Sequence, residues 1–293
     1  MVAPAFEYAA ARSYDEAVHL LADGGDEAKV LAGGQSLMPM LNLRLARPEL
    51  LIDINTADDR PPSVADGMLR LPALTRHRVL LEHDLIRQHC PLLAAAVWHV
   101  GNVRVRNRGT VGGSLAHADP TSEIGSCALA TGAQIVVRGP RGNRTVPASE
   151  LFVSYLTTAL ADTEVITDVL IPVSGPRQGW SFREMVRRTS DFAIVAVAAV
   201  VEFQDGKDAV AAARVALAGV ADRVTLVSQE LLVGLIGGTG DEASVDAVAG
   251  RIAGSVEPPD DVHASGDYRR RLVRVLTADA LREACARAAG VAA

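Results

Sequence analysis

The segment NRGTVGGSLAHADPTSE, residues 107–123, places the adjacent glycines Gly112 and Gly113 just before a serine. A second glycine doublet lies far upstream, in VLAGGQSLMPM, residues 30–40. One doublet alone is commonly a tight turn, because glycine adopts positive φ angles freely. Without β-carbons, however, successive backbone N–H groups can also converge on a phosphate, and a following helix start favours an anion. Two such loops in one chain favour a ligand with two phosphates.

The first glycine loop lies within a β-loop-α-β pattern. Residues 28–34 favour a short strand that runs into the glycines, and Ser36 is placed to begin a helix over residues 37–46. Pro39 is tolerated there only because it falls in the first turn. The apolar run at residues 49–54 favours a second strand that is buried on both faces. The loop is therefore expected between a strand and a helix start, where phosphates bind.

Segments rich in proline, glycine and aspartate divide the chain. One covers residues 58–67 and reads as a linker or surface turn, and another lies near residues 172–179. Beyond them, two apolar runs flank Asp205 and Gly206, which predicts a β-hairpin. We expect strands over residues 133–139 and 164–173, and helices over residues 13–24, 75–90, 92–100, 123–132, 241–254 and from 266 onward.

The composition describes a globular protein without an evident nucleic-acid partner. The chain has 293 residues and a formal net charge of -6, which gives no reason to expect a basic nucleic-acid surface. No apolar run approaches the roughly 20 residues of a membrane helix, and the N-terminal segment does not resemble a signal peptide, so we expect a cytoplasmic protein. Cys90, Cys127 and Cys285 are too few and too far apart for a disulfide framework or a metal site.

A dinucleotide ligand would also suit a Rossmann fold, but the motif does not match. Asp53 ends an expected strand about 20 residues after Gly33, where a ribose-binding carboxylate would lie. Neither glycine loop has the GxGxxG spacing that lets a pyrophosphate approach the helix. We therefore interpret Asp53 as a strand-end or turn residue. The sequence also lacks a P-loop lysine, a GxSxG elbow and an HExxH motif.

Several polar residues near the second glycine loop have more than one interpretation. Arg104, Arg106 and Arg108 alternate as on one face of an extended segment, which favours a solvated or interface face over phosphate contact. His117 is the histidine beside a glycine loop and is a candidate for cofactor contact, whereas the other histidines are expected mostly on helix surfaces. Glu123 either caps the next helix or accepts a hydrogen bond from a ligand hydroxyl.

Over nearly its whole length the chain resembles the FAD-binding medium subunits of molybdenum hydroxylases. It looks closest to the carbon monoxide dehydrogenase type, which is related to the flavin domain of xanthine dehydrogenase. Three segments carry the resemblance: LAGGQSLMPMLNLRLARPELLIDI at residues 31–54, VRNRGTVGGSLAHADPTSE at residues 105–123, and FREMVRRTSDFAIVAVAA at residues 182–199. The first two are specific in combination.

The resemblance implies an α+β architecture. It implies a vanillyl-alcohol-oxidase-like (PCMH-like) FAD-binding fold in two subdomains, residues 1–57 and 58–176. A C-terminal α+β domain, residues 177–293, would follow, with a three-stranded sheet and helices. In this family both glycine loops wrap the FAD diphosphate, so the two bare backbones would close on one pyrophosphate.

The resemblance also implies the cofactor-binding residues. The loops supply Ala32, Gly33, Gly34, Gln35, Ser36, Thr110, Val111, Gly112, Gly113 and Ser114. Glu123 stands where the family has an aspartate that contacts the cofactor, and Ile166 where an apolar residue packs near the adenine. Arg183 falls where some relatives place a lysine near the flavin ring, and Phe192 where many have Tyr or Trp close to the isoalloxazine. Gln35 and Ser114 replace a histidine and a common asparagine, which weakens any assignment of carbon monoxide as substrate.

The implied function is that of the flavoprotein subunit of a molybdenum-containing oxidoreductase. FAD, bound non-covalently, would receive electrons from [2Fe-2S] clusters on a small partner subunit and pass them to an external acceptor such as a quinone. Molybdopterin would lie on a large partner subunit, with the assembly a dimer of heterotrimers in the cytoplasm, peripheral to the inner face of the membrane through its partners. We name no catalytic side chain and no metal ligand in this chain. The alternatives are a flavin- or nucleotide-binding regulatory module and a stand-alone flavin oxidoreductase.

Overall fold

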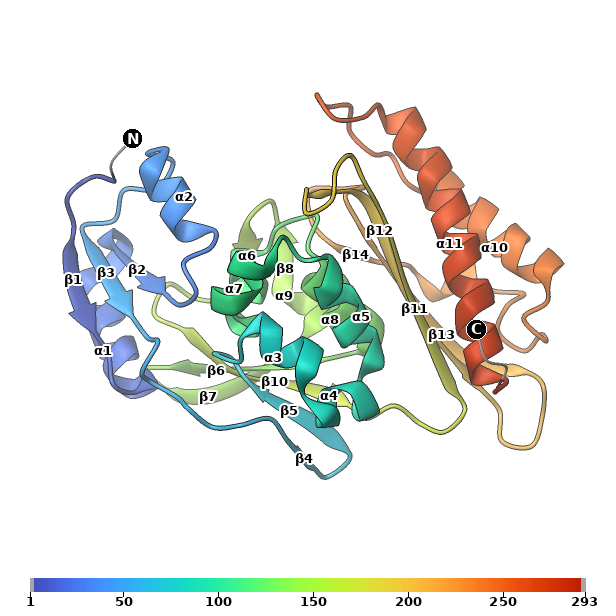
Figure 1. The fold of residues 1–293 in the computed structure, drawn as a ribbon, viewed down its shortest axis with the longest axis horizontal. Helices are drawn as coiled ribbons and strands as arrows, with labels where there is room; N and C mark the ends of the chain where they lie inside the picture. The colour runs from blue at the N-terminus through green and yellow to red at the C-terminus, as the bar shows by residue number, and fades with distance from the viewer. Residues whose placement is uncertain (1–2, 291–293) are drawn as a thin grey trace.

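Three sheets of three or more strands follow one another along the chain in the computed structural model, which describes residues 3–290 (Figure 1). The first is small and parallel, the second has five strands and the third has four. Helices of the middle region lie between the second and third sheets, and two C-terminal helices cover the far side of the third (Figure 1). The arrangement confirms the expected α+β class.

The N-terminal unit is the predicted β-loop-α-β arrangement with one preceding strand and helix. Its parallel sheet has the order β1-β3-β2, from β1 (Glu7–Ala10), β2 (Ala28–Leu31) and β3 (Leu50–Asp53). Helix α1 (Tyr14–Gly24) begins at Ser13, whose side chain accepts a hydrogen bond from the Glu16 amide at 3.1 Å. Asp53 ends β3, as interpreted from the sequence.

The helix after the first glycine loop is shorter than predicted. Helix α2 covers Leu37–Asn42 and does not continue to residue 46. Arg44 has a φ of 60°, in the left-handed region, and this conformation ends the helical path before Pro48 is reached. Ser36 occupies the N-cap position, but its side chain makes no capping hydrogen bond.

The second sheet is antiparallel with the order β4-β5-β10-β6-β7. Its strands are β4 (Ser63–Ala65), β5 (Met68–Pro72), β6 (Gln134–Gly139), β7 (Gly142–Pro147) and β10 (Val165–Pro172). The short elements α9 (Ala148–Leu151), β8 (Phe152–Ser154) and β9 (Thr157–Thr158) connect β7 to β10. The expected linker at residues 58–67 is therefore only partly a linker, because β4 pairs with β5 inside it.

Six short helices cover one side of this sheet. They are α3 (His77–Glu82), α4 (Asp84–His89), α5 (Pro91–His99), α6 (Val103–Arg108), α7 (Val111–His117) and α8 (Glu123–Thr131). The helix predicted over residues 75–90 is two helices, because the chain becomes extended at His83, which caps α4. The prediction that Arg104, Arg106 and Arg108 lie on an extended segment was also wrong. Residues 103–108 form α6, which Asn102 caps. Arg106 folds back to the end of α5, where it donates to Gly101 O at 2.9 Å and lies over the Trp98 ring.

The C-terminal sheet has three long antiparallel strands, β11 (Gln178–Val186), β12 (Ala193–Phe203) and β13 (Val210–Ala218). A two-residue strand, β14 (Thr225–Leu226), adds a fourth to the three expected. Helices α10 (Glu242–Ser255) and α11 (Gly266–Ala288) pack on one face. A β-carbon at Gly179 would lie 1.8 Å from Ala284 O, so this glycine lets α11 approach β11 closely.

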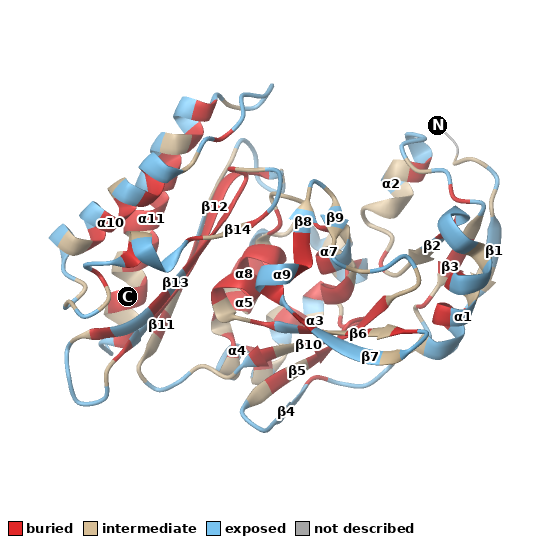
Figure 2. Ribbon diagram, turned by 180° about the vertical axis from the view of Figure 1, so that it is seen from behind, coloured by how far each residue is buried: buried red, intermediate tan, exposed pale blue. Residues whose placement is uncertain are grey.

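Strand β12 is buried on both faces, which explains its uninterrupted apolar sequence (Figure 2). Ala196, Ala198 and Val200 join the core of the middle region. Val195 and Val197 alternate with them and join the core beneath α10 and α11. Because side chains alternate along a strand, one apolar run serves two cores and fixes the C-terminal domain against the middle region.

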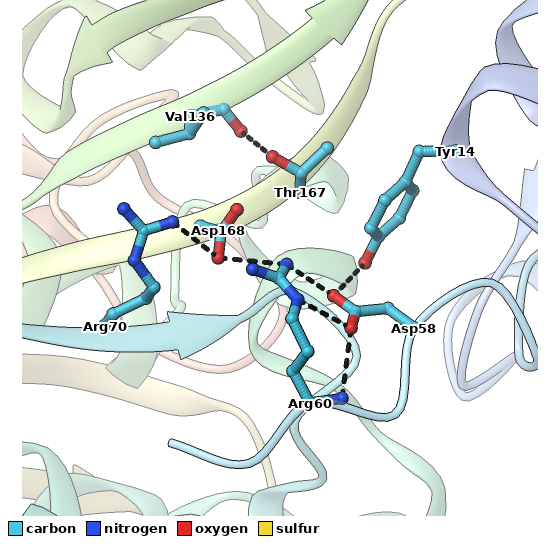
Figure 3. Close-up of polar contacts among 7 residues, drawn as sticks. All are labelled: Tyr14, Asp58, Arg60, Arg70, Val136, Thr167 and Asp168. Atoms are coloured by element: carbon cyan, nitrogen blue, oxygen red, sulfur yellow. Dashed lines mark hydrogen bonds and ion pairs between the residues drawn. The ribbon is translucent and has the colours of Figure 1, made fainter. Parts of the chain in front are cut away.

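A partly buried polar network joins the N-terminal unit to the second sheet (Figure 3). Tyr14 Oη on α1 donates to Asp58 at 3.3 Å, and Arg60 pairs with Asp58 at 2.7 Å and with Asp168 at 3.2 Å. Arg70 on β5 also approaches Asp168, at 3.3 Å. Asp168 is 4% exposed, so two cations compensate its buried charge. The network anchors the connection between the N-terminal unit and the second sheet.

Candidate functional site

A cavity of about 990 Å³ lies between the N-terminal unit and the middle region. One wall comes from α1, β2 and the first glycine loop, and the opposite wall comes from α7, β10 and the segments around β9. Ser190, Asp191 and Phe192, which precede β12, close part of the rim. The volume is at the upper end of the range of about 300–1,000 Å³ for cofactor sites.

The first glycine loop presents unpaired backbone donors to this cavity. Gly34 has a φ of 71°, which reverses the chain between β2 and α2. Within residues 3–290, no protein acceptor pairs with the N–H groups of Gly33, Gly34, Gln35 or Ser36. The side chain of Gln35 instead donates to Gly33 O at 3.1 Å. Four successive free donors around a left-handed residue form the kind of concave donor set that binds phosphate oxygens.

The second glycine loop is different, because its amides are bonded within the protein. The N–H groups of Val111 and Gly112 donate to Thr75 O at 3.1 Å and Ala73 O at 2.9 Å. That of Gly113 donates to the Thr110 side chain at 3.1 Å. The loop therefore contributes a bare backbone surface to the cavity, while the first loop contributes the free amides. The sequence motif does not distinguish these two roles.

Two of the glycines are required by close contacts with other segments. A β-carbon at Gly33 would lie 2.3 Å from Arg108 O, and one at Gly112 would lie 2.6 Å from the β-carbon of Ala73. The first contact joins the two glycine loops directly. The second seats α7 against the end of β5.

His77 is buried against the second glycine loop. The sequence predicted most histidines on helix surfaces and did not identify this role. His77 is 2% exposed, and its Nε2 lies 3.1 Å from both Thr110 O and Ser114 Oγ. Since a carbonyl only accepts, Nε2 carries the proton. Burial lowers the pKa of His77 to about 4, so the ring is neutral near pH 7.

Glu123 lies in the cavity wall as the first residue of α8. Ser122, and not Glu123, caps this helix, accepting from Gly125 N at 2.9 Å, so the capping interpretation was wrong. Burial, together with the nearby carboxylates of Glu184 and Asp119, raises the pKa of Glu123 to about 8. A protonated Glu123 can donate as well as accept a hydrogen bond in the cavity.

Most residues proposed from the sequence line the cavity. These are Ala32, Gly33, Gly34, Gln35, Ser36, Thr110, Gly112, Gly113, Ser114, Glu123, Ile166 and Phe192, and His117 lies with them. Val111 points instead into the core of the middle region. Arg183 is not part of the lining, because on β11 it pairs with Glu283 of α11 at 3.1 Å.

Phe192 is the exposed aromatic side chain at the cavity rim. It is 72% exposed and immediately precedes β12, so it is not a core residue. Other lining residues lie outside the three segments that carry the resemblance: Lys29, Leu74, Thr157 and Thr158. They come together because β9 and loops of the N-terminal unit and the middle region line one cavity.

Two family models cover most of the chain. The model of the FAD binding domain in molybdopterin dehydrogenase matches residues 4–174, and that of the CO dehydrogenase flavoprotein C-terminal domain matches residues 180–284.

Within the described residues, no helix has the length and apolarity needed to cross a bilayer, and no group of three His, Cys, Asp or Glu side chains is arranged to hold a metal.

Individual relatives match from end to end. Subunit alpha of the 6-hydroxypseudooxynicotine dehydrogenase complex of Paenarthrobacter nicotinovorans is 37% identical, over 98% of this chain and 97% of the relative. The carbon monoxide dehydrogenase medium chain of Hydrogenophaga pseudoflava is 35% identical, over 99% and 100%. A solved structure of carbon monoxide dehydrogenase from that organism superposes with a TM-score of 0.94, 35% identity and coverage of 98% and 99%. The chain belongs to the family of FAD-binding medium subunits of molybdenum hydroxylases, and it is an oxidoreductase subunit.

Proposed function

We propose that the cavity binds FAD non-covalently, with the pyrophosphate on the amides of the first glycine loop. The observation that carries this proposal is the run of N–H groups from Gly33 to Ser36 with no protein acceptor in the described chain. Unpaired donors at a cavity wall are stabilised by an anionic ligand. Ile166 would pack near the adenine and Glu123 would bond a cofactor hydroxyl.

The other contacts of the cavity fit the same cofactor. The bare backbone at Gly112 and Gly113 leaves room for the pyrophosphate between the loops. Phe192 at the rim would cover the isoalloxazine. None of the three cysteines lines the cavity, and all three are buried, which supports a non-covalent site. We leave Arg183 out of the site, because its guanidinium pairs with Glu283 instead.

When bound, FAD supplies the redox chemistry, taking up electrons and delivering them to an acceptor. The residues of this chain bind the cofactor, orient its ring and limit the access of water. The electrons would come from [2Fe-2S] clusters of a small partner subunit and leave to an external acceptor such as a quinone. Substrate would be oxidised at molybdopterin on a large partner subunit, so its pocket would not lie in this chain.

The names of the relatives support an assembly of this kind, since they are a medium chain and a complex subunit. We propose a dimer of heterotrimers, located in the cytoplasm and peripheral to the inner face of the membrane through its partners. Co-purification from the native source should yield molybdenum, iron and flavin in one complex. A monodisperse monomer that oxidises an organic substrate alone would instead identify a stand-alone flavin oxidoreductase.

Titration of the purified chain with FAD tests the cofactor directly. We expect one equivalent to bind and to be released intact on denaturation. A chain that remains colourless with FAD present would contradict the proposal. A flavin that binds but is neither bleached by a reductant nor reoxidised by a quinone would identify a regulatory module.

A further inference from the structure

Two side chains outside the cavity connect the two glycine loops. Asn55 Nδ2 donates to the carbonyl of Ala32 in the first loop at 2.8 Å. Asn55 Oδ1 accepts from Arg76 Nη2 at 2.6 Å. Arg76 Nη1 in turn donates to the carbonyl of Arg108, immediately before Gly109 of the second loop. A continuous path of three hydrogen bonds therefore runs from one loop to the other.

The amide of Asn55 is held in one orientation. Asp53 Oδ1 accepts from the Asn55 backbone amide at 2.8 Å and from Nδ2 at 2.6 Å. Tyr8 Oη donates to the other carboxylate oxygen of Asp53 at 2.8 Å. Because Nδ2 faces two acceptors, Oδ1 must face the donor on Arg76. Asp53, at the end of β3, thus fixes which way the Asn55 side-chain amide faces.

Arg76 is also fixed by its backbone. It precedes α3 in an extended conformation and forms an isolated antiparallel bridge with Thr110. The next residue, His77, donates its N–H to Gly109 O at 3.0 Å. Arg76 is half-buried, and within residues 3–290 no carboxylate lies within ion-pair distance of its guanidinium. Its two terminal nitrogens, Nη1 and Nη2, donate to the carbonyl of Arg108 and to Asn55.

We propose that Asn55 and Arg76 are positioning residues that form a brace between the two glycine loops, and that this brace sets the affinity for FAD. Neither side chain lines the cavity, so both would act through the loops. The free amides of residues 33–36 belong to one subdomain and the opposing backbone of residues 109–113 belongs to the other. A pyrophosphate between them is held well only if the spacing is fixed before binding. The inference rests on the proposed FAD site.

Substitution of each residue in the full chain, after removal of bound flavin, tests the brace. Asn55→Ala and Arg76→Gln should each raise the Kd for FAD by about tenfold, the effect of losing one or two hydrogen bonds. Because the bonds act in series, the double variant should be about as weak as the weaker single variant. Isothermal titration with FAD gives the Kd and the stoichiometry, and thermal melting of the flavin-free chain gives its stability.

Arg78 offers a matched control. It lies two residues along on α3, is exposed, and makes no side-chain hydrogen bond to the described residues. Arg78→Gln removes the same charge and should leave the Kd within about twofold, since an exposed charge acts weakly through water. Arg76→Lys keeps the charge with a single donor group and should give an intermediate Kd. It also serves as the milder variant if Arg76→Gln does not fold.

The outcomes separate the brace from its alternatives. Lower melting temperatures with an unchanged Kd would make Asn55 and Arg76 purely structural, and the proposal would be wrong. Equal weakening by Arg76→Gln and Arg78→Gln would indicate general attraction of an anion and would also overturn it. Strictly additive effects in the double variant would contradict a connected path. If the unsubstituted chain does not bind FAD, the proposed function itself fails, independently of the variants.

Discussion

A β-carbon on Gly33 would lie 2.3 Å from the carbonyl oxygen of Arg108, so the two glycine loops touch backbone to backbone. The contact explains why the glycine is needed even though its φ is not in the left-handed region. Gly34, by contrast, has a φ of 71° and is needed for its conformation. The two adjacent glycines therefore serve different physical purposes.

Gly33→Ala should weaken FAD binding by about tenfold or more, because the added methyl forces the two loops apart at a cost of roughly 1–3 kcal/mol. Equilibrium titration with FAD measures the effect. Gly250→Ala is the matched control: it lies within α10 with nothing within 4 Å of the added β-carbon. This control should raise stability slightly, since alanine favours a helix by up to about 1 kcal/mol over glycine. Equal FAD affinity in both variants would show that the contact between Gly33 and Arg108 does not affect FAD binding.

Phe192→Ala should change the rate of flavin reoxidation by a quinone while leaving most FAD bound. The side chain is 72% exposed, so its removal should cost less than about 0.5 kcal/mol of stability and not the 3–5 kcal/mol of a core aromatic. Stopped-flow reoxidation and thermal melting on the same variant provide the two measurements. Tyr155→Ala removes an aromatic of similar exposure that does not line the cavity and should leave reoxidation unchanged. A large fall in melting temperature with normal reoxidation would make Phe192 a packing residue.

Glu123 should make the flavin-free chain less stable as the pH rises from about 5 to 8. Its folded-state pKa of about 8 lies above the ordinary value of 4.5, mainly because of burial, so the folded chain retains the proton longer than the unfolded chain. The stabilising contribution is complete below pH 4.5 and is lost as the pH passes through 8. Glu123→Gln should match the parent near pH 5 and melt at a higher temperature at pH 8. Glu257→Gln, at an exposed position, should melt at the same temperature as the parent at every pH. If the melting temperature of Glu123→Gln also changes with pH in parallel with the parent, the raised pKa of Glu123 is refuted.

Asp168→Asn should destabilise the protein by about 1–3 kcal/mol, because it removes a buried anion that Arg60 and Arg70 both approach. Both arginines keep partial access to water, which limits the loss of stability. Asp208→Asn removes a carboxylate that is 91% exposed and lies 3.5 Å from Arg177, and it should change stability by less than about 0.5 kcal/mol. Chemical denaturation of both variants compares the two pairs. Similar effects would mean that the network between the subdomains contributes no more than a surface ion pair.

Local patterns were sufficient to predict most elements. Ser13 and Gly24 delimit α1, and the turn signal at Asp205 and Gly206 lies between β12 and β13. These predictions succeeded because capping and turn formation depend on residues close in sequence. The arginine segment failed for the opposite reason: Asn102 begins a helix there, and Arg106 is held by the end of a different helix.

The sequence by itself predicted two glycine loops of the kind that bind phosphate, an α+β chain and membership of a flavoprotein family, since motif and spacing are local properties. Tertiary structure alone decided which loop offers free amides, because the partners of Val111 and Gly112 are carbonyls of Thr75 and Ala73 on another segment. It also decided that Arg183 pairs with α11 and that Asn55 and Arg76 connect the loops. Hydrogen-bond partners far apart in sequence follow from how the subdomains pack, and no local pattern encodes them.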